Sequence, residues 1–289
     1  MPSWKKMAPC LVRTPARRLL WQYRRATSRS RSLPDFIIIG TQKSGTSSLH
    51  AYLAQHPQLL PSYAKEVHFF DGGLNPCVDN FEKGEAWYRS HFPLRSSMAA
   101  DSRTFEASPL YIFNPLTPAR ISGLVPEVKL VALLRNPTER AISHYFHETR
   151  IGHEPLPIKE ALLEEEKRLT SVIDKGDWKN NAFIHHSYKS RGLYAQQITR
   201  FLDHFPMRQI LALSSEEFFR EPGKILRLVF EFVGVETGFK VRDLKPRNVA
   251  SNKGVVDADV YRYLDRYFAP HNQTLYKLIR KSFGWENSD

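Results

Sequence analysis

The sequence predicts an α/β fold in which helices flank a central parallel sheet. Short apolar runs of strand length alternate along the chain with longer segments whose apolar residues follow helical spacing. The first of these runs, Phe36–Ile39, leads into a loop between Gly40 and Gly45 and then into a helix, the order of a phosphate-binding strand–loop–helix unit. Strands that alternate with helices build parallel sheets covered on both faces, with ligands at the carboxyl ends of the strands.

The strand and helix pairs can be placed one by one. The helix after the glycine loop is expected to end before Pro57, because proline lacks the N–H group that a helix interior needs. Val128–Leu134 predicts a second strand, and Asn136–Pro137 predicts the start of the helix that follows it. Gln209–Leu213 predicts a third strand, and Thr104–Ala107 predicts a short fourth one.

Two charged segments have different interpretations. The helix expected around Ile158–Ile173 carries the charged run Glu164–Arg168, which is interpreted as a solvated helix face. The segment Gly238–Asp257 lacks periodicity and carries five Lys or Arg residues, which is typical of a loop that grips an anion. An ordinary soluble loop is the alternative interpretation of that segment.

Composition divides the chain into a short leader and one domain. The 289 residues, 42% of them hydrophobic, suffice for a single domain, which is expected to span residues 35–289. Residues 1–34 hold nine Lys or Arg and no Asp or Glu, whereas the rest of the chain carries 33 basic and 30 acidic residues. The leader is therefore expected to be a basic flexible or targeting segment, or one that touches a membrane surface. The nearly neutral domain does not predict a nucleic-acid partner.

Other features of the composition bear on compartment and metal content. No stretch approaches the roughly 20 apolar residues of a transmembrane span. Cys10 and Cys77 are too few for a disulfide framework, and no His or Cys spacing predicts a metal site. A cytoplasmic location is expected, with an organelle reached through the leader, or the Golgi lumen if a signal anchor is missing, as alternatives.

The glycine loop lacks the lysine of a nucleoside-triphosphate site. That motif, G-x-x-x-x-G-K-[ST], places lysine after its second glycine, whereas Thr46 stands there in this chain and Lys43 lies inside the loop. Backbone N–H groups at a helix N-terminus still favour an anion, as do a lysine and several hydroxyls. The residues expected to bind this anion are Lys43, Ser44, Gly45, Thr46, Ser47 and Ser48.

A second anion site is expected where the strand Val128–Leu134 ends. A site for a magnesium-bound nucleoside triphosphate would have an acid there, but Arg135 follows the strand, and Ser143 lies eight residues later. A cation at this point indicates that protein charge holds a second anionic group. This argues against a phosphotransferase such as a nucleoside kinase, which stays open as an alternative together with a non-catalytic binder of polyanions.

The paired motifs QKSGTSSL, from Gln42, and LLRNPTERAISHY, from Leu133, resemble the nucleotide-binding motifs of sulfotransferases that use 3′-phosphoadenosine 5′-phosphosulfate (PAPS). The resemblance implies the sulfotransferase fold, PAPS as cosubstrate and no metal. It implies that the loop Lys43–Ser48 binds the 5′-phosphosulfate, and that Arg135 and Ser143 bind the 3′-phosphate. It also implies that Lys43 neutralises the leaving phosphate.

The segment KEVHFFD, Lys65–Asp71, resembles the catalytic segment of heparan sulfate glucosaminyl sulfotransferases. The resemblance implies that Glu66 is the general base, assisted by His68, and that the acceptor is a hydroxyl, or less readily an amine, of a carbohydrate-like molecule. In an extended segment Glu66 and His68 would share one face, and Asp71 could orient the histidine. Packing is the alternative role for His68 and Asp71. Among the other histidines, His147 and His153 are candidates to meet the acceptor, and surface or packing roles are expected for His185, His186 and His271.

The resemblance covers roughly residues 35–285 and includes the segment Ser251–Gly254, where Lys253 and Gly254 are implied to close over the nucleotide. It has two departures. Ala107 stands where the heparan sulfate enzymes usually carry lysine, and Lys65 is a possible substitute for that cation. The disulfide that those animal enzymes carry near their C-terminal nucleotide loop cannot form between Cys10 and Cys77.

Overall fold

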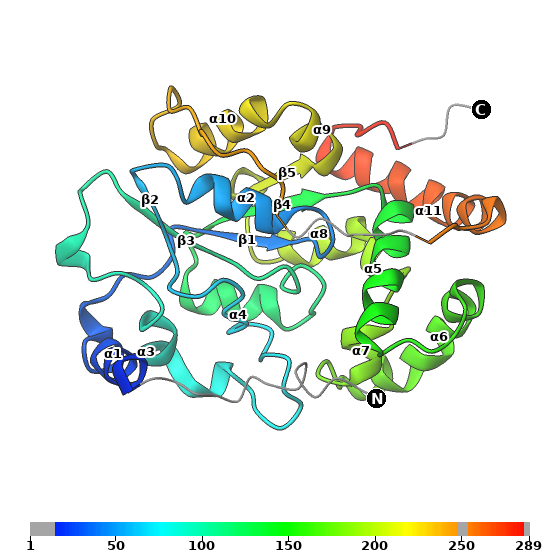
Figure 1. Ribbon diagram of the computed structural model, residues 1–289, viewed down its shortest axis with the longest axis horizontal. Coiled ribbons are helices and arrows are strands. Elements are labelled where there is room, and N and C mark those ends of the chain that lie inside the picture. Colours follow the sequence, from blue (N-terminus) through cyan, green and yellow to red (C-terminus); the bar gives the residue numbers. More distant parts are fainter. Residues whose placement is uncertain (1–14, 248–253, 286–289) are drawn as a thin grey trace.

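The computed structural model describes residues 15–247 and 254–285. A parallel sheet of five strands lies at its centre, in the order β2-β3-β1-β4-β5 (Figure 1). The strands are β1 (Phe36–Gly40), β2 (Leu59–Pro61), β3 (Arg103–Ala107), β4 (Lys129–Leu134) and β5 (Ile210–Ser214). The predicted α/β class and four predicted strands are confirmed. The three-residue β2 was missed, because it is too short to show an alternating pattern.

Strand β1 and the buried part of β4 are continuous apolar runs because both faces of the sheet are covered. Ile37 and Ile39 of β1 point into one buried cluster, whereas Phe36 and Ile38 point into the cluster on the opposite face. Residues of a strand alternate between faces, so a strand buried on both sides needs a continuous apolar run. This is why β1 and β4 could be recognised from the sequence.

Helices cover the two faces of the sheet and extend beyond one end of it (Figure 1). One face packs against α2 (Thr46–Leu53), α9 (Ser215–Arg220) and α10 (Pro222–Val233). The other packs against α4 (Thr117–Leu124), α8 (Tyr194–Leu202) and the end of α11 (Ala258–Ile279). Two further buried clusters join α5 (Pro137–Ile151), α6 (Ile158–Lys175), α7 (Asn181–His185) and α11.

The start of α5 follows the predicted capping pattern. The Asn136 side chain accepts hydrogen bonds from the backbone N–H groups of Thr138 at 2.9 Å and Glu139 at 3.3 Å, and Pro137 is the first helical residue. These bonds satisfy donors that have no partner inside the helix. The cap fixes the point at which the chain leaves β4, and therefore the position of Arg135.

Part of the expected leader, residues 15–34, packs against the domain. Residues Pro15–Ala26 form α1, which packs against α3 (Gly84–Arg89) and its C-terminal flank, where Trp21 makes edge contacts with Trp87 and His91. Arg24 donates to the carbonyl groups of Ser90 and Phe92 at 2.6 and 2.9 Å. Arg31, with 2% of its surface exposed, also donates to the Phe92 carbonyl. These arginines stabilise the fold instead of forming a flexible arm.

Residues 1–14 of the expected leader lie outside the described residues. Within the part of the chain that is described, none of the helices combines the length and the apolar character needed to cross a bilayer.

The charged run on α6 is not a uniformly solvated face. Lys167 is exposed as expected, but Glu165 is 1% exposed, and its carboxylate accepts hydrogen bonds from the backbone N–H groups of Lys189 and Ser190. Glu165 lies on the same side of α6 as the buried residues Ala161, Leu162 and Leu169. It therefore anchors the turn before α8, a role that a run of charged letters does not reveal.

Candidate active site

A cavity of about 830 Å³ opens where the carboxyl ends of β1 and β4 meet the N-terminal ends of α2 and α5. It is lined by the loop after β1, the segment around Glu66, the tip of β4, and residues of α5, α7 and α9. The predicted site residues among its lining are Lys43, Gly45, Thr46, Ser47, Glu66, His68, Arg135 and Ser143. Segments far apart in the sequence thus meet at one cavity, as expected at the end of a parallel sheet.

Close packing and backbone conformation fix the glycine loop. Gly45 has φ of +93°, and a Cβ atom there would lie 2.6 Å from the ring of Phe219. At Gly40 a Cβ atom would lie 2.4 Å from Ile112. Both positions therefore exclude any larger residue, and α2 begins immediately after the loop at Thr46. The N-terminal end of α2 then faces the cavity, and the positive end of the helix dipole favours an anion there.

Lys43 lies at the centre of this loop. Its backbone carbonyl accepts a hydrogen bond from Nη1 of Arg135 at 3.0 Å, which couples the loop to the tip of β4. Burial lowers the pKa of the Lys43 ammonium, and the positive charges of Arg150 and Arg135 lower it further, against an opposing effect of Glu148. Burial and the neighbouring arginines thus disfavour the charged form of Lys43. Binding of an anion beside it would offset this cost and stabilise the ammonium.

Two of the predicted hydroxyl ligands do not line the cavity. The Ser44 hydroxyl is fully buried and pairs with the hydroxyl of Thr41. The Ser48 hydroxyl accepts a hydrogen bond from the N–H group of Arg247 at 2.8 Å and is also fully buried. The Ser44 and Ser48 side chains therefore hold the loop and the segment around Arg247 in place. Thr46 and Ser47 are the hydroxyl residues of the loop that line the cavity.

Arg135 and Ser143 lie on the cavity wall formed by the tip of β4 and α5, as predicted. The Arg135 guanidinium also donates to Oε2 of Glu139 at 3.1 Å. This ion pair holds the Arg135 guanidinium in place. When an anion binds there, Glu139 and the anion must share the N–H donors of that guanidinium.

The late basic segment is described only in part. Arg247 lines the cavity, which agrees with an anion-gripping loop. Lys253 lies outside the described residues. Gly254 is exposed and is not among the residues that line the cavity; a Cβ atom there would lie 3.1 Å from the Phe146 ring. The closing of Lys253 and Gly254 over a nucleotide stays a prediction.

The segment around Glu66 is not extended, contrary to the expectation. Glu66 and His68 have φ of +60° and +51°, so the backbone turns left-handed twice. Their side chains nevertheless meet at the cavity, where Nε2 of His68 lies 3.6 Å from Oε2 of Glu66. The other ring nitrogen, Nδ1, lies 2.6 Å from Oδ2 of the buried Asp71. Asp71 therefore orients His68, and His68 contacts Glu66.

These contacts set the charges of the pair. Burial alone would lower the pKa of His68, but Asp71 and Glu66 outweigh it and raise that pKa to about 10. Burial alone would raise the pKa of Glu66, but a hydrogen bond from His68 and the charge of Lys65 lower it to about 2. At neutral pH the cavity therefore holds an ionised carboxylate beside an imidazolium. The Glu66 side chain is 43% exposed, so a substrate group can reach it.

Lys65 supplies a cation beside Glu66, on the turn that bonds to the backbone of Ala107. The Lys65 ammonium forms an ion pair with the Glu66 carboxylate. Ala107 is fully buried, and its carbonyl accepts a hydrogen bond from the Glu66 N–H group at 3.0 Å. The positive charge is therefore attached to the turn that carries Glu66, and the substitution of Lys65 for a lysine at position 107 stays a prediction.

A buried acid that the sequence reasoning missed supports this turn from below. Both Tyr88 and Tyr111 donate their hydroxyls to Oε1 of Glu106, at 2.6 and 3.1 Å, and Ser108 donates to Oε2 at 2.8 Å. Ser108 in turn accepts a hydrogen bond from the His68 N–H group at 3.2 Å. Burial raises the pKa of Glu106 to about 7. The sequence signal for this buried acid was a glutamate within the predicted strand Thr104–Ala107.

The far wall of the cavity brings in further residues. His147 lines the cavity as predicted for an acceptor contact, whereas His153 does not. His185, expected to have a surface or packing role, does line it. Arg191, which the sequence reasoning did not select, also lines it and donates to Gln42 and to the Ile184 carbonyl. These residues come from segments separated by long stretches of chain, so no local motif marks them.

Three features meet at one cavity: a glycine loop at a helix N-terminus, a second cationic anchor, and an acid–histidine pair. Together they define an α/β group-transfer enzyme. The chain belongs to the sulfotransferase domain family, whose model matches residues 33–251. A solved sulfotransferase from Alicyclobacillus acidocaldarius is 32% identical, with a TM-score of 0.72 over 89% of this chain and all of that one. The predicted enzyme class and fold are thereby confirmed.

Curated relatives include heparan sulfate enzymes. The bifunctional heparan sulfate N-deacetylase/N-sulfotransferase 1 of Caenorhabditis elegans is 32% identical over 277 residues, which are 87% of this chain and 30% of the relative. Human heparan sulfate glucosamine 3-O-sulfotransferase 3B1 is 31% identical over 282 residues, 90% of this chain and 66% of the relative. The chain thus spans about a third of the first relative and about two thirds of the second.

Proposed function

We propose that this sulfotransferase moves a sulfuryl group from PAPS to a hydroxyl of a carbohydrate-like acceptor. The observation that carries the proposal is the single cavity that joins two anion anchors to the Glu66–His68 pair. The glycine loop and the start of α2 suit the 5′-phosphosulfate, and Arg135 with Ser143 suits the 3′-phosphate. The names of the heparan sulfate relatives favour a glucosamine-containing saccharide as acceptor.

The proposed transfer is a direct in-line displacement at sulfur. The acceptor oxygen forms a bond to sulfur while its proton passes to Glu66, and the bond between sulfur and the bridging phosphate oxygen breaks. The electron pair of that bond stays on the bridging oxygen, so adenosine 3′,5′-bisphosphate leaves with an additional negative charge. Lys43 and the N–H groups at the start of α2 are placed to neutralise that charge.

His68 keeps Glu66 in position in this mechanism. As an imidazolium held by Asp71, it donates toward Glu66 and stabilises the ionised carboxylate. Binding of an acceptor displaces water from the pair, which makes the carboxylate a stronger base than it is in the open cavity. In this in-line geometry, Lys43 and the acceptor hydroxyl lie on opposite sides of the transferred group.

The proposal is tested by incubating the full chain with PAPS and a panel of unsulfated and partly sulfated glucosamine-containing oligosaccharides. Mass spectrometry of the products should show the gain of one sulfuryl group on at least one saccharide, with release of adenosine 3′,5′-bisphosphate. Comparison of N-acetylated with N-unsubstituted saccharides separates transfer to oxygen from transfer to nitrogen. Sulfation of simple phenols, with none of any saccharide, would contradict the proposed acceptor class.

The alternative of a polyanion binder that acts through the leader loses two of the basic residues of that segment. Arg24 and Arg31 are already bound to backbone carbonyl groups and are not available to a ligand.

A further inference from the structure

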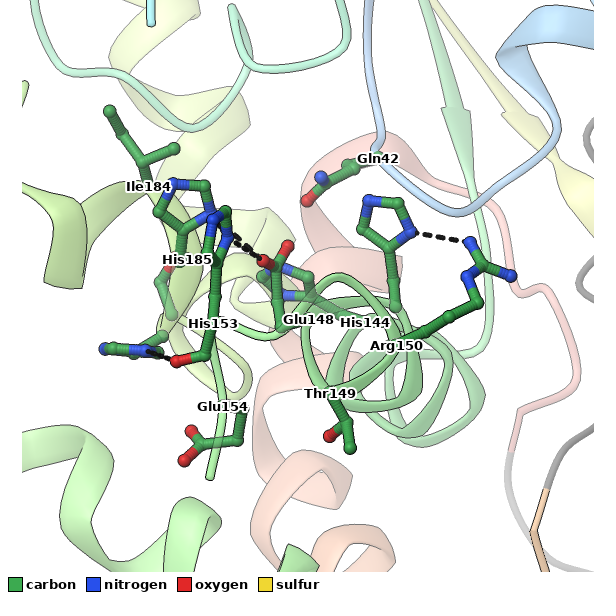
Figure 2. Close-up of polar contacts among 12 residues, drawn as sticks. Gln42, His144, Glu148, Thr149, Arg150, His153, Glu154, Ile184 and His185 are labelled. Carbon is green, nitrogen blue, oxygen red and sulfur yellow. Dashed lines mark hydrogen bonds and ion pairs between the residues drawn. The ribbon is translucent and has the colours of Figure 1, made fainter. Parts of the chain in front are cut away.

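Three side chains, two of which line the far wall of the cavity, meet in an arrangement that the sulfuryl transfer does not use. Glu148 belongs to α5, His153 follows the end of that helix, and His185 ends α7 (Figure 2). Nδ1 of His153 lies 2.9 Å from Nδ1 of His185. Oε2 of Glu148 lies 3.1 Å from the first nitrogen and 3.0 Å from the second. The three atoms form a nearly equilateral triangle.

Hydrogen bonds alone cannot satisfy all three sides of this triangle. A carboxylate has no hydrogen to donate, so Oε2 of Glu148 can only accept hydrogen bonds from the two imidazoles. If both histidines donate to it from Nδ1, neither can accept from the other across 2.9 Å. If one Nδ1 is unprotonated, its lone pair faces the Glu148 oxygen. In every protonation state, therefore, at least one of the three atom pairs brings two hydrogens or two lone pairs face to face, which is repulsive.

We propose that Glu148, His153 and His185 form a binding site for a zinc ion. Two imidazole nitrogens and a carboxylate oxygen are a common ligand set for zinc. A cation between them removes the conflict, because all three atoms then direct lone pairs at it. Tetrahedral zinc with bonds of about 2.0–2.1 Å separates its ligand atoms by roughly 3.3 Å, so the triangle needs to widen by only about 0.3 Å.

Neighbouring groups form hydrogen bonds that orient the proposed ligands, as is usual at metal sites. Nε2 of the buried His144 lies 3.1 Å from Oε1 of Glu148, so it can orient the carboxylate through the oxygen that the metal does not need. The His153 carbonyl lies 3.1 Å from Nε2 of His186, which fixes the turn after α5. Three protein ligands leave a fourth position open, and since Glu148 and His185 line the cavity, the site lies at the cavity wall.

The test uses the full chain, stripped with a chelator and then incubated with zinc chloride. After gel filtration, mass spectrometry should find one zinc per chain in the wild type and in His204→Ala, which removes an exposed histidine outside the cluster. The double variant His153→Ala/His185→Ala should retain none. Because His153 is exposed and His185 half-buried, this double variant should still fold.

Two further readouts keep the result decisive. Zinc should raise the melting temperature of the wild type and leave that of the double variant unchanged, because only a folded site binds the ion. Cobalt in place of zinc should give the visible absorption of a tetrahedral site in the wild type alone. No retained zinc in the wild type, or equal retention in the double variant, would overturn the proposal. Neither readout depends on the acceptor or on sulfuryl transfer.

Discussion

The two ends of the cavity are built in different ways. The end formed by the glycine loop, α2 and the tip of β4 depends on backbone: glycine at Gly45, N–H groups at a helix start, and the Asn136 cap beside Arg135. The end formed by Glu66 and His68 depends on side chains: Asp71 of the same segment orients His68, and Glu106 of β3 supports the turn through Ser108. Short motifs mark both ends, but the conformation of the second end and its support by Glu106 become visible only in the fold.

The largest expected effect belongs to the side-chain end. Glu66→Gln keeps the size of the side chain and removes the base, so kcat should fall by roughly 10²–10⁴-fold. Affinity for adenosine 3′,5′-bisphosphate should stay within about 2-fold of the wild-type value, since the nucleotide anchors are untouched. Single-turnover rates and calorimetry measure the two quantities. Glu82→Gln, at an exposed position outside the cavity, is the matched control. Equal activity of the two variants would remove Glu66 from its role.

A smaller effect is expected at Asp71, in the pH profile. In the wild type, the pKa of about 2 for Glu66 and of about 10 for His68 predict a broad plateau of kcat/KM between those limits. Asp71→Asn removes the main group that raises the pKa of His68, so the alkaline limb should move toward neutral pH. The acid limb should move up less, because Lys65 still stabilises the Glu66 carboxylate. An unchanged alkaline limb would show that Asp71 does not act through His68.

The smallest effect concerns stability at Glu106. Its pKa of about 7 in the folded protein exceeds the ordinary value of 4.5, so the folded state holds the proton more tightly than the unfolded state. The stability from Glu106 is therefore complete below pH 4.5 and is lost as the pH rises through about 7. Glu106→Gln, which cannot ionise, should flatten this decline by an amount on the order of 1–3 kcal/mol. Denaturant unfolding at pH 5 and pH 8 measures the difference. A decline equal to that of the wild type would contradict the account.

Local signals predicted most of the fold. The strand β4 and the start of α5 could be predicted because an apolar run, a capping residue and a proline act within a few residues of each other. Packing of α1 could not, because Arg24 and Arg31 look like any basic leader until the carbonyl groups of Ser90 and Phe92 are brought beside them. The same limit explains the error at Glu165.

The site residues also differ in how far the sequence could predict them. Lys43, Arg135 and Ser143 lie in motifs whose chemistry is visible from spacing, and the structure brings them to one cavity. The left-handed turns at Glu66 and His68 were missed because residues other than glycine rarely adopt positive φ, and the segment carries no glycine to signal such a turn before Gly72. The triangle of Glu148, His153 and His185 was missed because His185 is 32 residues from His153.

The most direct test of the account is calorimetric binding of adenosine 3′,5′-bisphosphate in metal-free buffer, to the wild type and to Arg135→Ala. The account predicts binding by the wild type without added metal and a loss of roughly 10–100-fold in affinity for the variant, since a charge-assisted bidentate contact is removed. ATP with magnesium should compete poorly. Preference for ATP with magnesium, or binding that does not depend on Arg135, would contradict the proposal that this cavity holds the nucleotide of PAPS.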